Sequence, residues 1–220
     1  SPDAIMEQTV MHALFPETPY RFESGGDPAA IPQLSQETFE TFHKTYYHPS
    51  NSYLYLYGNL DIEATLQYLD EAYLSSFDAI TVDSAINQQT PSAKTIECTA
   101  PYPVAPSEVL TEKAMLSMNI VTGEATDAEM YLAFQALNYL LLQTPAAPLK
   151  NALIDAGIGK EVSGSFVKSI RQPIFSIEVT GTEGDRKDKF IRTVYKTLQA
   201  LTMKGIDKSL IEATLNLLEF

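Results

Sequence analysis

With 220 residues, of which 45% are hydrophobic, the chain is large enough for one sizeable or two small domains and too apolar to be intrinsically disordered. Its net charge of −13 disfavours nucleic acid as a partner, because an acidic surface repels phosphates, and no apolar run is long enough to span a membrane. The single Cys98 cannot form an internal disulfide, so nothing indicates an oxidising compartment.

Three helices are predicted within residues 1–77. The first begins with Ser1 as its N-cap, and a proline-rich loop over residues 15–34 follows it. Ser35 is placed to cap the second helix and Asp61 the third, because short polar side chains at these positions accept a hydrogen bond from a free backbone N–H. The start on a helix cap is typical of a piece excised from a longer architecture.

One strand is predicted over residues 52–57, where three tyrosines alternate with leucines. The tyrosines could form a stacking platform, but a strand face packed under helices is the commoner use of this pattern. His48-Pro49 cannot continue the preceding helix, and Gly58 permits a sharp exit from the strand. The residues of these turns, and of the loop before them, are interpreted as structural: Gly25, Gly26, Asp27, His48, Pro49, Asn51 and Gly58.

A linker is predicted over residues 78–92, which lack strong periodicity, and further strands and helices follow it. Thr126 and Glu129 have the spacing of a capping box at a helix start. Gly157 and Gly205 are expected to end two of the helices, and Asp207 to cap the last. The predicted strands cover residues 94–98, 114–121, 161–168 and 174–180, and the predicted helices cover 127–142, 148–157, the segment before Gly205 and the segment after Asp207.

This order of elements predicts an α+β fold in two lobes, each an antiparallel sheet with helices on one face. The first domain would cover residues 1–77, as the C-terminal part of a larger domain. The second would cover residues 93–220 and be truncated in its last helix. Residues 1–90 carry a net charge of −11, which is either a solvated face or a wall that attracts basic peptides.

The sequence holds no self-contained active site. Zinc peptidases commonly use H-x-x-E-H or its inverse, and the three histidines, His12, His43 and His48, do not have this spacing. Neither a G-x-S-x-G nucleophile elbow nor a dinucleotide-binding glycine loop is present. We therefore expect no catalytic and no metal-ligating residue in this chain.

Several motifs nevertheless resemble one family in the expected order. The stretch from "SGGDP" through "YYHPSN" to "YGN" at residues 20–59, and "TPAAPLKNALIDAGIGKEV" at residues 144–162, are similar to the insulinase/pitrilysin superfamily of zinc metallopeptidases, in its presequence-protease-like branch. The resemblance implies ferredoxin-like domains that build a two-halved chamber for degrading peptides. The superfamily's zinc-binding motif has no counterpart here, so zinc is expected in the parent protein and not in this chain.

The resemblance leaves two readings of function. In the first, the chain is a non-catalytic segment of a peptide-degrading zinc peptidase, whose partners are peptide substrates and the remaining domains of the same polypeptide. In the second, it is a scaffold or interaction module of a superfamily member that has lost catalysis. Strand 52–58 would lack its neighbours and could support a dimer. The expected location is cytoplasmic, or an organellar matrix if the source is eukaryotic.

Overall fold

The computed structural model describes residues 1–219 and divides the chain into two compact units. Unit 1 comprises residues 1–21 and 88–220, and unit 2 comprises residues 22–87. One boundary, at residue 87, falls inside the predicted linker, whereas the grouping of residues 1–21 with the C-terminal part was not predicted.

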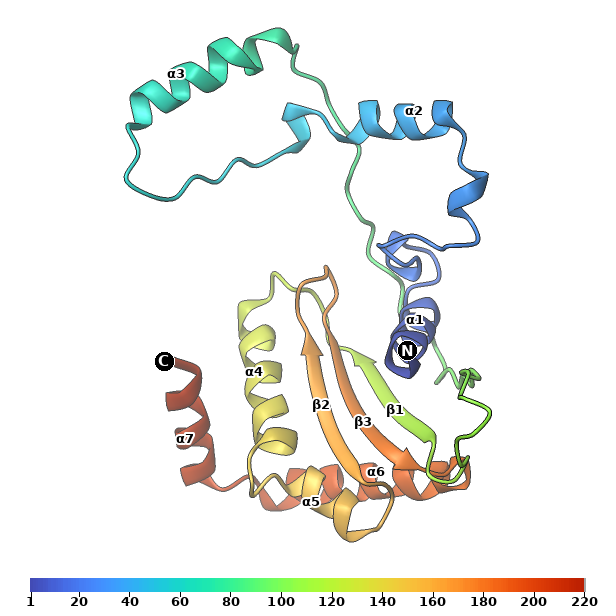
Figure 1. Cartoon of the computed structure of the whole chain (residues 1–220). Helices are drawn as coiled ribbons and strands as arrows, with labels where there is room; N and C mark the ends of the chain where they lie inside the picture. The colour runs from blue at the N-terminus through green and yellow to red at the C-terminus, as the bar shows by residue number, and fades with distance from the viewer. Residues whose placement is uncertain (220) are drawn as a thin grey trace. The chain divides into compact units, whose positions relative to one another are not determined.

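Unit 1 is built on a three-stranded antiparallel sheet in the order β1-β3-β2 (Figure 1). The strands are β1 (Ala114–Val121), β2 (Glu161–Val167) and β3 (Ile174–Thr182). The central strand β3 is largely buried, as expected for a strand paired on both edges, and its apolar residues alternate with polar ones from Phe175 to Thr180. The strands predicted at 114–121, 161–168 and 174–180 are therefore confirmed, to within two residues.

The core of unit 1 lies between one face of this sheet and a layer of helices. From β3, Phe175, Ile177 and Val179 point toward the helices, because alternate residues of a strand share a face. They meet buried leucine, phenylalanine and valine side chains from the helical layer, so α+β with helices on one face is confirmed. That layer comprises α4 (Ala128–Asn138), the π-helical turn η5 (Tyr139–Gln143), α5 (Pro148–Asp155) and α6 (Lys187–Lys204).

Two further helices of unit 1 lie at its chain ends. Helix α1 (Pro2–Leu14) begins with a hydrogen bond from the Ala4 backbone N–H to Ser1 Oγ, so the predicted N-cap is confirmed. Helix α7 (Lys208–Glu219) begins after Asp207, whose carboxylate accepts the Ser209 backbone N–H at 2.8 Å. In the described residues 1–219 we find no helix that combines the length and the hydrophobicity needed to span a membrane.

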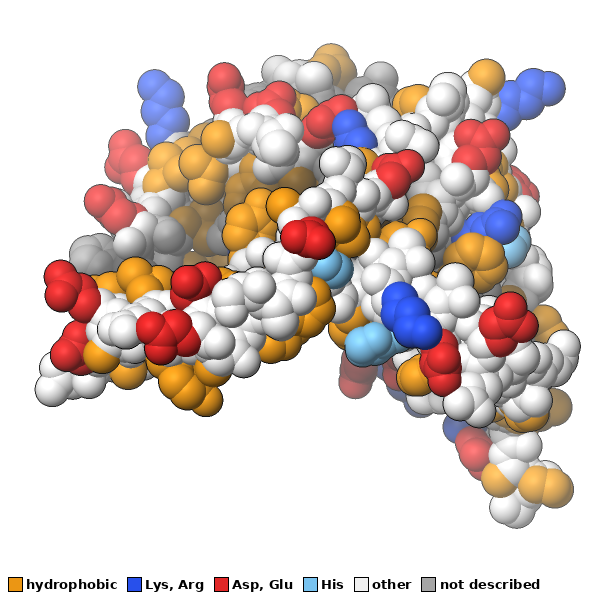
Figure 2. Space-filling model, turned by 90° about the horizontal axis from the view of Figure 1, so that it is seen from above, with side chains coloured by type: hydrophobic (Ala, Val, Ile, Leu, Met, Phe, Trp, Pro, Cys, Tyr) orange, Lys and Arg blue, Asp and Glu red, His pale blue; other side chains and the backbone are white. Residues whose placement is uncertain are grey.

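Unit 2 contains α2 (Gln36–Tyr46) and α3 (Ile62–Ala72), with short 3₁₀ turns beside them. Both predicted caps are confirmed: Ser35 accepts the Thr38 backbone N–H, and Asp61 accepts the Ala64 backbone N–H, each at 3.1 Å. No hydrophobic side chain of residues 22–87 is buried, whereas unit 1 holds a continuous core. Hydrophobic side chains accordingly reach the surface beside acidic ones in the space-filling view (Figure 2).

Three local predictions were wrong. Residues 94–98 form no strand, and the chain from 77 to 113 has no helix or ladder among its described residues. Residues 52–57 are extended but unpaired, since the structure described for 1–219 contains no partner strand for them. The cap of α4 is Asp127 and not Thr126, because Asp127 Oδ1 accepts the Met130 N–H at 3.1 Å. A carboxylate one residue later displaced the predicted capping box.

Candidate functional site

The loop residues predicted as structural form an isolated turn in unit 2. Asp27 Oδ1 accepts the Ala29 N–H at 2.8 Å, and the Asp27 carbonyl accepts the N–H groups of Ala30 and Ile31. Gly26 has φ +87°, a conformation that side chains disfavour. The "SGGDP" stretch is therefore a backbone turn closed by its own aspartate, and its carboxylate is already engaged in that turn.

The "HPSN" stretch forms a 3₁₀ turn between α2 and the extended segment. His48 Nδ1 accepts the Ser50 N–H at 3.1 Å, and Pro49 begins the turn. The Asn51 side chain donates to the Tyr46 carbonyl at 2.9 Å and accepts from Ser84 Oγ at 2.7 Å. These bonds give His48 and Asn51 a role in shaping the turn.

The extended segment 52–57 carries the most exposed aromatic side chains of unit 2. Tyr53, Tyr55 and Tyr57 are almost fully exposed, and Leu54 and Leu56 are 67% and 49% exposed. Gly58 follows with φ +139°, which permits the expected sharp exit. The expectation of a strand face packed under helices is not met within the described part of the chain.

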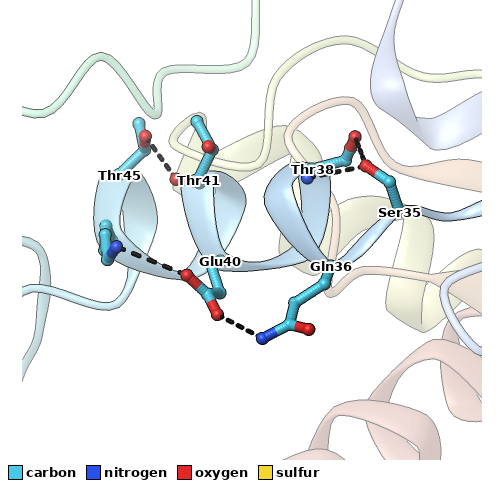
Figure 3. A network of polar contacts seen from close by, with 7 residues as sticks. Ser35, Gln36, Thr38, Glu40, Thr41 and Thr45 are labelled. Carbon is cyan, nitrogen blue, oxygen red and sulfur yellow. Dashed lines mark hydrogen bonds and ion pairs between the residues drawn. The ribbon is translucent and has the colours of Figure 1, made fainter.

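Helix α2, which precedes these motifs, has a polar face organised by local bonds (Figure 3). Gln36 donates to Glu40 at 2.8 Å, and the same carboxylate lies 3.5 Å from Lys44 Nζ. At its start, the Ser35 and Thr38 hydroxyls are 2.8 Å apart. These are contacts typical of a solvated helix face.

The described residues 1–219 do not offer a fitting site for zinc. His43 stacks on Tyr47 with ring centroids 4.8 Å apart, while His48 packs edge-on against Phe77 at 5.4 Å. Within residues 1–219, no three side chains of His, Cys, Asp or Glu are grouped as a metal would require.

Sequence reasoning missed a polar cavity in unit 1, between α4, η5, β2 and α7. Its lining combines side-chain amides, a lysine and apolar groups: Gln135, Asn138, Tyr139, Gln143, Phe166, Lys168 and Leu218. Asn138 is the buried polar member, and it stands in an otherwise apolar run, "ALNYLLL". That interruption was the one signal available from sequence, because the residues come from four separate elements.

The second face of the sheet carries Glu178, a carboxyl group with a shifted pKa. Glu178 points away from the core, since its neighbours Ile177 and Val179 point into it. Burial raises the pKa of the Glu178 carboxyl above its ordinary value of 4.5, and the charges of Asp3 and Glu7 on α1 raise it further. Helix α1 thus brings carboxylates toward a sheet face that already holds one.

These features define a domain in which helices cover one face of an antiparallel sheet. Residues 33–218 match the model of the family described as "Peptidase M16 inactive domain". Since this match spans most of the chain, the chain belongs to the M16 peptidase family, the insulinase family of metallopeptidases, through its inactive domain. The family resemblance inferred from the motifs is confirmed.

Curated relatives match along the whole chain. Protein HypA of Clostridium perfringens is 47% identical over 220 residues, covering 100% of this chain and 23% of the relative. Presequence protease 1, chloroplastic/mitochondrial, of Arabidopsis thaliana is 35% identical, and the match covers 100% of this chain and 21% of the relative. The mitochondrial presequence protease of Danio rerio is 32% identical, and the match covers 99% of this chain and 22% of the relative. The chain thus spans about a quarter or less of the length of these relatives.

Solved structures share the fold at low sequence identity. The peptidase M16 inactive domain from Pseudomonas fluorescens has a TM-score of 0.69 at 16% identity, covering 97% of this chain and 50% of that one. A conserved protein from Enterococcus faecalis also has a TM-score of 0.69, at 17% identity, and the match covers 98% of this chain and 50% of that one. At these identities the likeness establishes the fold alone.

Proposed function

We propose that the chain is a non-catalytic segment of a zinc-dependent peptidase that degrades peptides inside a two-halved chamber. The observation that carries the proposal is the match to presequence proteases along 99–100% of this chain but only 21–22% of their length. The catalytic motif expected for this family is absent from the sequence, and the described side chains group no metal ligands. Catalysis would therefore reside elsewhere in the parent polypeptide.

In this proposal the chain contributes architecture. The core gives unit 1 a rigid helical layer on one side of its sheet. On the opposite side, Ser117 and Ser163 lie in register with Glu178, and Ser176 lies two residues from it along β3. Ser176 is buried, so this polar face is partly covered, and the proposed partners are peptide substrates and the remaining domains of the polypeptide.

Residues 1–77 and 93–220 would belong to the first and second domains of that polypeptide, joined by residues 78–92. The apolar segment 52–58 would pair with neighbouring strands of its domain, or with a second copy when those are missing. The location would be cytoplasmic in a bacterium or an organellar matrix in a eukaryote. The plant and fish relatives are named as mitochondrial or chloroplastic/mitochondrial.

The test compares this 220-residue chain with the natural full-length polypeptide. Zinc content after dialysis and hydrolysis of an unstructured peptide are measured for both. We expect one zinc and chelator-sensitive hydrolysis for the full-length protein only. A full-length protein without metal and without hydrolysis would favour the scaffold or interaction-module reading. Tightly held zinc in the 220-residue chain would contradict the proposal.

A further inference from the structure

Helix α7 packs on α4 and η5 through one of its sides. Ile211, Thr214 and Leu218 lie on that side, at the spacing of three and four residues that aligns side chains along a helix. Thr214 is 1% exposed, and Ile211 and Leu218 are half-buried. Figure 1 shows α7 at the margin of unit 1, beside α4. This contact accounts for one side of the helix.

A second apolar side of α7 remains open to solvent. Leu210, Ala213 and Leu217 repeat the same spacing one position earlier, so they form a stripe about 100° around the helix from the first. Leu210 is half-buried, Ala213 is exposed and Leu217 is 52% exposed. A surface helix needs only one apolar stripe to pack on its own domain, so a second stripe is typical of a helix that protein covers on two sides.

The second stripe leads into an apolar hollow where α7 meets the end of α6. The hollow has a volume of about 490 Å³, which is room for a large apolar side chain. It is lined by Ala146, Pro148, Leu201, Gly205, Ile206, Asp207, Ser209, Leu210 and Ala213. Asp207 alone among them is charged, and its carboxylate already accepts hydrogen bonds from the backbone N–H and the hydroxyl of Ser209. The hollow and the stripe therefore suit an apolar partner surface.

The length of the relatives identifies the source of that surface. The chain corresponds to 23% of the Clostridium perfringens relative and to 21–22% of the two presequence proteases. Proteins of this length hold further domains, and adjoining domains of one polypeptide bury about 600–1,500 Å² of surface between them. A segment of the same polypeptide is present at an effective concentration on the order of millimolar, so it has the advantage over a second copy of the chain.

The shape of the site favours a helix as the docking element. Helix α7 has 12 residues and is therefore about 18 Å long, so its second stripe is straight and extends over several turns. An amphipathic helix matches such a stripe with apolar residues at the same spacing, as in other helix-in-groove contacts. The small side chain of Ala213, in the middle of the stripe, permits a close approach of the two helices.

We propose that the second stripe of α7, together with the hollow beside it, is the docking site for an amphipathic helix from another domain of the same polypeptide. One large apolar side chain of that helix would fill the hollow, and its neighbours would pack along Leu210, Ala213 and Leu217. The inference concerns how the domains assemble. It goes beyond the proposed peptidase function, because a parent protein without catalysis would dock in the same way.

Two leucines of α7 provide a matched test in the full-length protein. Leu215 and Leu217 are 53% and 52% exposed, and they lie about 200° apart around the helix because two residues separate them. Leu215→Cys and Leu217→Cys are made separately, and alkylation at each position is followed by peptide mass spectrometry and normalised to the rate in denaturant. We expect alkylation at position 217 to be at least about tenfold slower than at position 215, because only the second stripe is covered.

Two further arms identify the occupant. Ala213→Glu places a carboxylate in the middle of the stripe, and it should bring alkylation of Leu217→Cys to within about twofold of Leu215→Cys while circular dichroism stays native. Dilution of the full-length protein should leave the protection unchanged, since the contact lies within one polypeptide. Protection that disappears on dilution would assign the site to a second copy and overturn the proposal. Equal alkylation rates of Leu215→Cys and Leu217→Cys in the full-length protein would also overturn it.

Discussion

The side chain of Gln172 pairs with the backbone of Gln89 as one strand residue pairs with another. Its Oε1 accepts the Gln89 N–H at 2.7 Å, and its Nε2 donates to the Gln89 carbonyl at 3.1 Å. Both residues are buried, at 3% and 6% exposure. The Gln89 side chain in turn accepts the Glu17 N–H at 2.9 Å. Three distant stretches of unit 1 thus meet at this pair, because a loop without a ladder still needs partners for its buried backbone.

Replacing Gln172 with leucine should destabilise unit 1. Gln172→Leu keeps most of the side-chain volume but leaves the Gln89 N–H and carbonyl unpaired, at a cost of about 2–4 kcal/mol. Native-state hydrogen exchange of the β3 amides measures how far the free energy of opening falls in the variant. Gln199→Leu, at an exposed position of α6, is the matched control and should change it by less than about 0.5 kcal/mol. Equal effects of both variants would contradict the assigned role.

Short-range sequence signals predicted helix caps in both units and the strands of the unit 1 sheet, whereas contacts between distant residues could not be predicted. The caps at Ser1, Ser35 and Asp61 and the strand β3 follow from short-range chemistry and were correct. The Gln172–Gln89 pair joins residues 83 positions apart and has no periodic signature. The unpaired stretch 52–57 shows that a local pattern alone does not make a strand. Its alternation specifies a two-faced extended chain, but a strand also requires a partner, which the described residues do not supply.

Gly159 is predicted to tolerate no side chain. A Cβ there would lie 2.7 Å from the Thr180 carbonyl oxygen and 2.3 Å from Val179 Cγ1, and backbone cannot move aside cheaply. Gly159→Ala should therefore cost about 1–3 kcal/mol of unit 1 stability. Gly184→Ala is the matched control, because nothing lies within 4 Å of its Cβ position. Thermal unfolding followed by circular dichroism compares the two, and a loss in Gly184→Ala alone would contradict the packing argument.

Glu178 should make unit 1 less stable as the pH rises. Its pKa is raised in the folded state by burial and by Asp3 and Glu7, so the folded carboxyl holds its proton more tightly than the unfolded one. This contribution to stability is complete below the unfolded value, near 4.5, and is lost as pH rises through the folded pKa. Glu178→Gln should flatten that decline in denaturant midpoints, whereas Glu212→Gln on exposed α7 should not. A decline with rising pH that is steeper in Glu178→Gln than in the native chain would reverse the assigned sign.

The exposed segment 52–57 should drive association of the isolated 220-residue chain. Leu54 and Leu56 are 67% and 49% exposed and lie between exposed tyrosines, so burying them against a second copy removes apolar surface from water. Sedimentation at increasing concentration should show dimers that weaken at least about tenfold in Leu54→Lys/Leu56→Lys. Leu217→Lys, at a similarly exposed position of α7, is the control. If the chain is a monomer at all concentrations, or if Leu217→Lys weakens the dimer as much as Leu54→Lys/Leu56→Lys does, segment 52–58 is not a dimer contact.

The acidic charge of residues 1–90 is expected to speed capture of basic peptides by the full-length protein. Several of these carboxylates are committed to structure, since Asp27 closes a turn, Glu17 bonds to Gln89 and Glu40 bonds to Gln36. Glu37 and Glu63 are exposed in the first turns of α2 and α3, and are the better probes. Each change to glutamine should lower kcat/KM for a basic peptide roughly twofold at low salt and leave a neutral peptide unaffected.

Salt separates this steering from a local structural effect. The loss for the basic peptide should fade as ionic strength rises, because screening shortens the reach of exposed charges. Glu212→Gln removes one exposed carboxylate from α7, outside the acidic stretch, and serves as the charge control. A loss that persists at high salt would indicate altered structure at α2 or α3. A loss shared by the neutral peptide would mean that these carboxylates act on something other than the charge of the substrate.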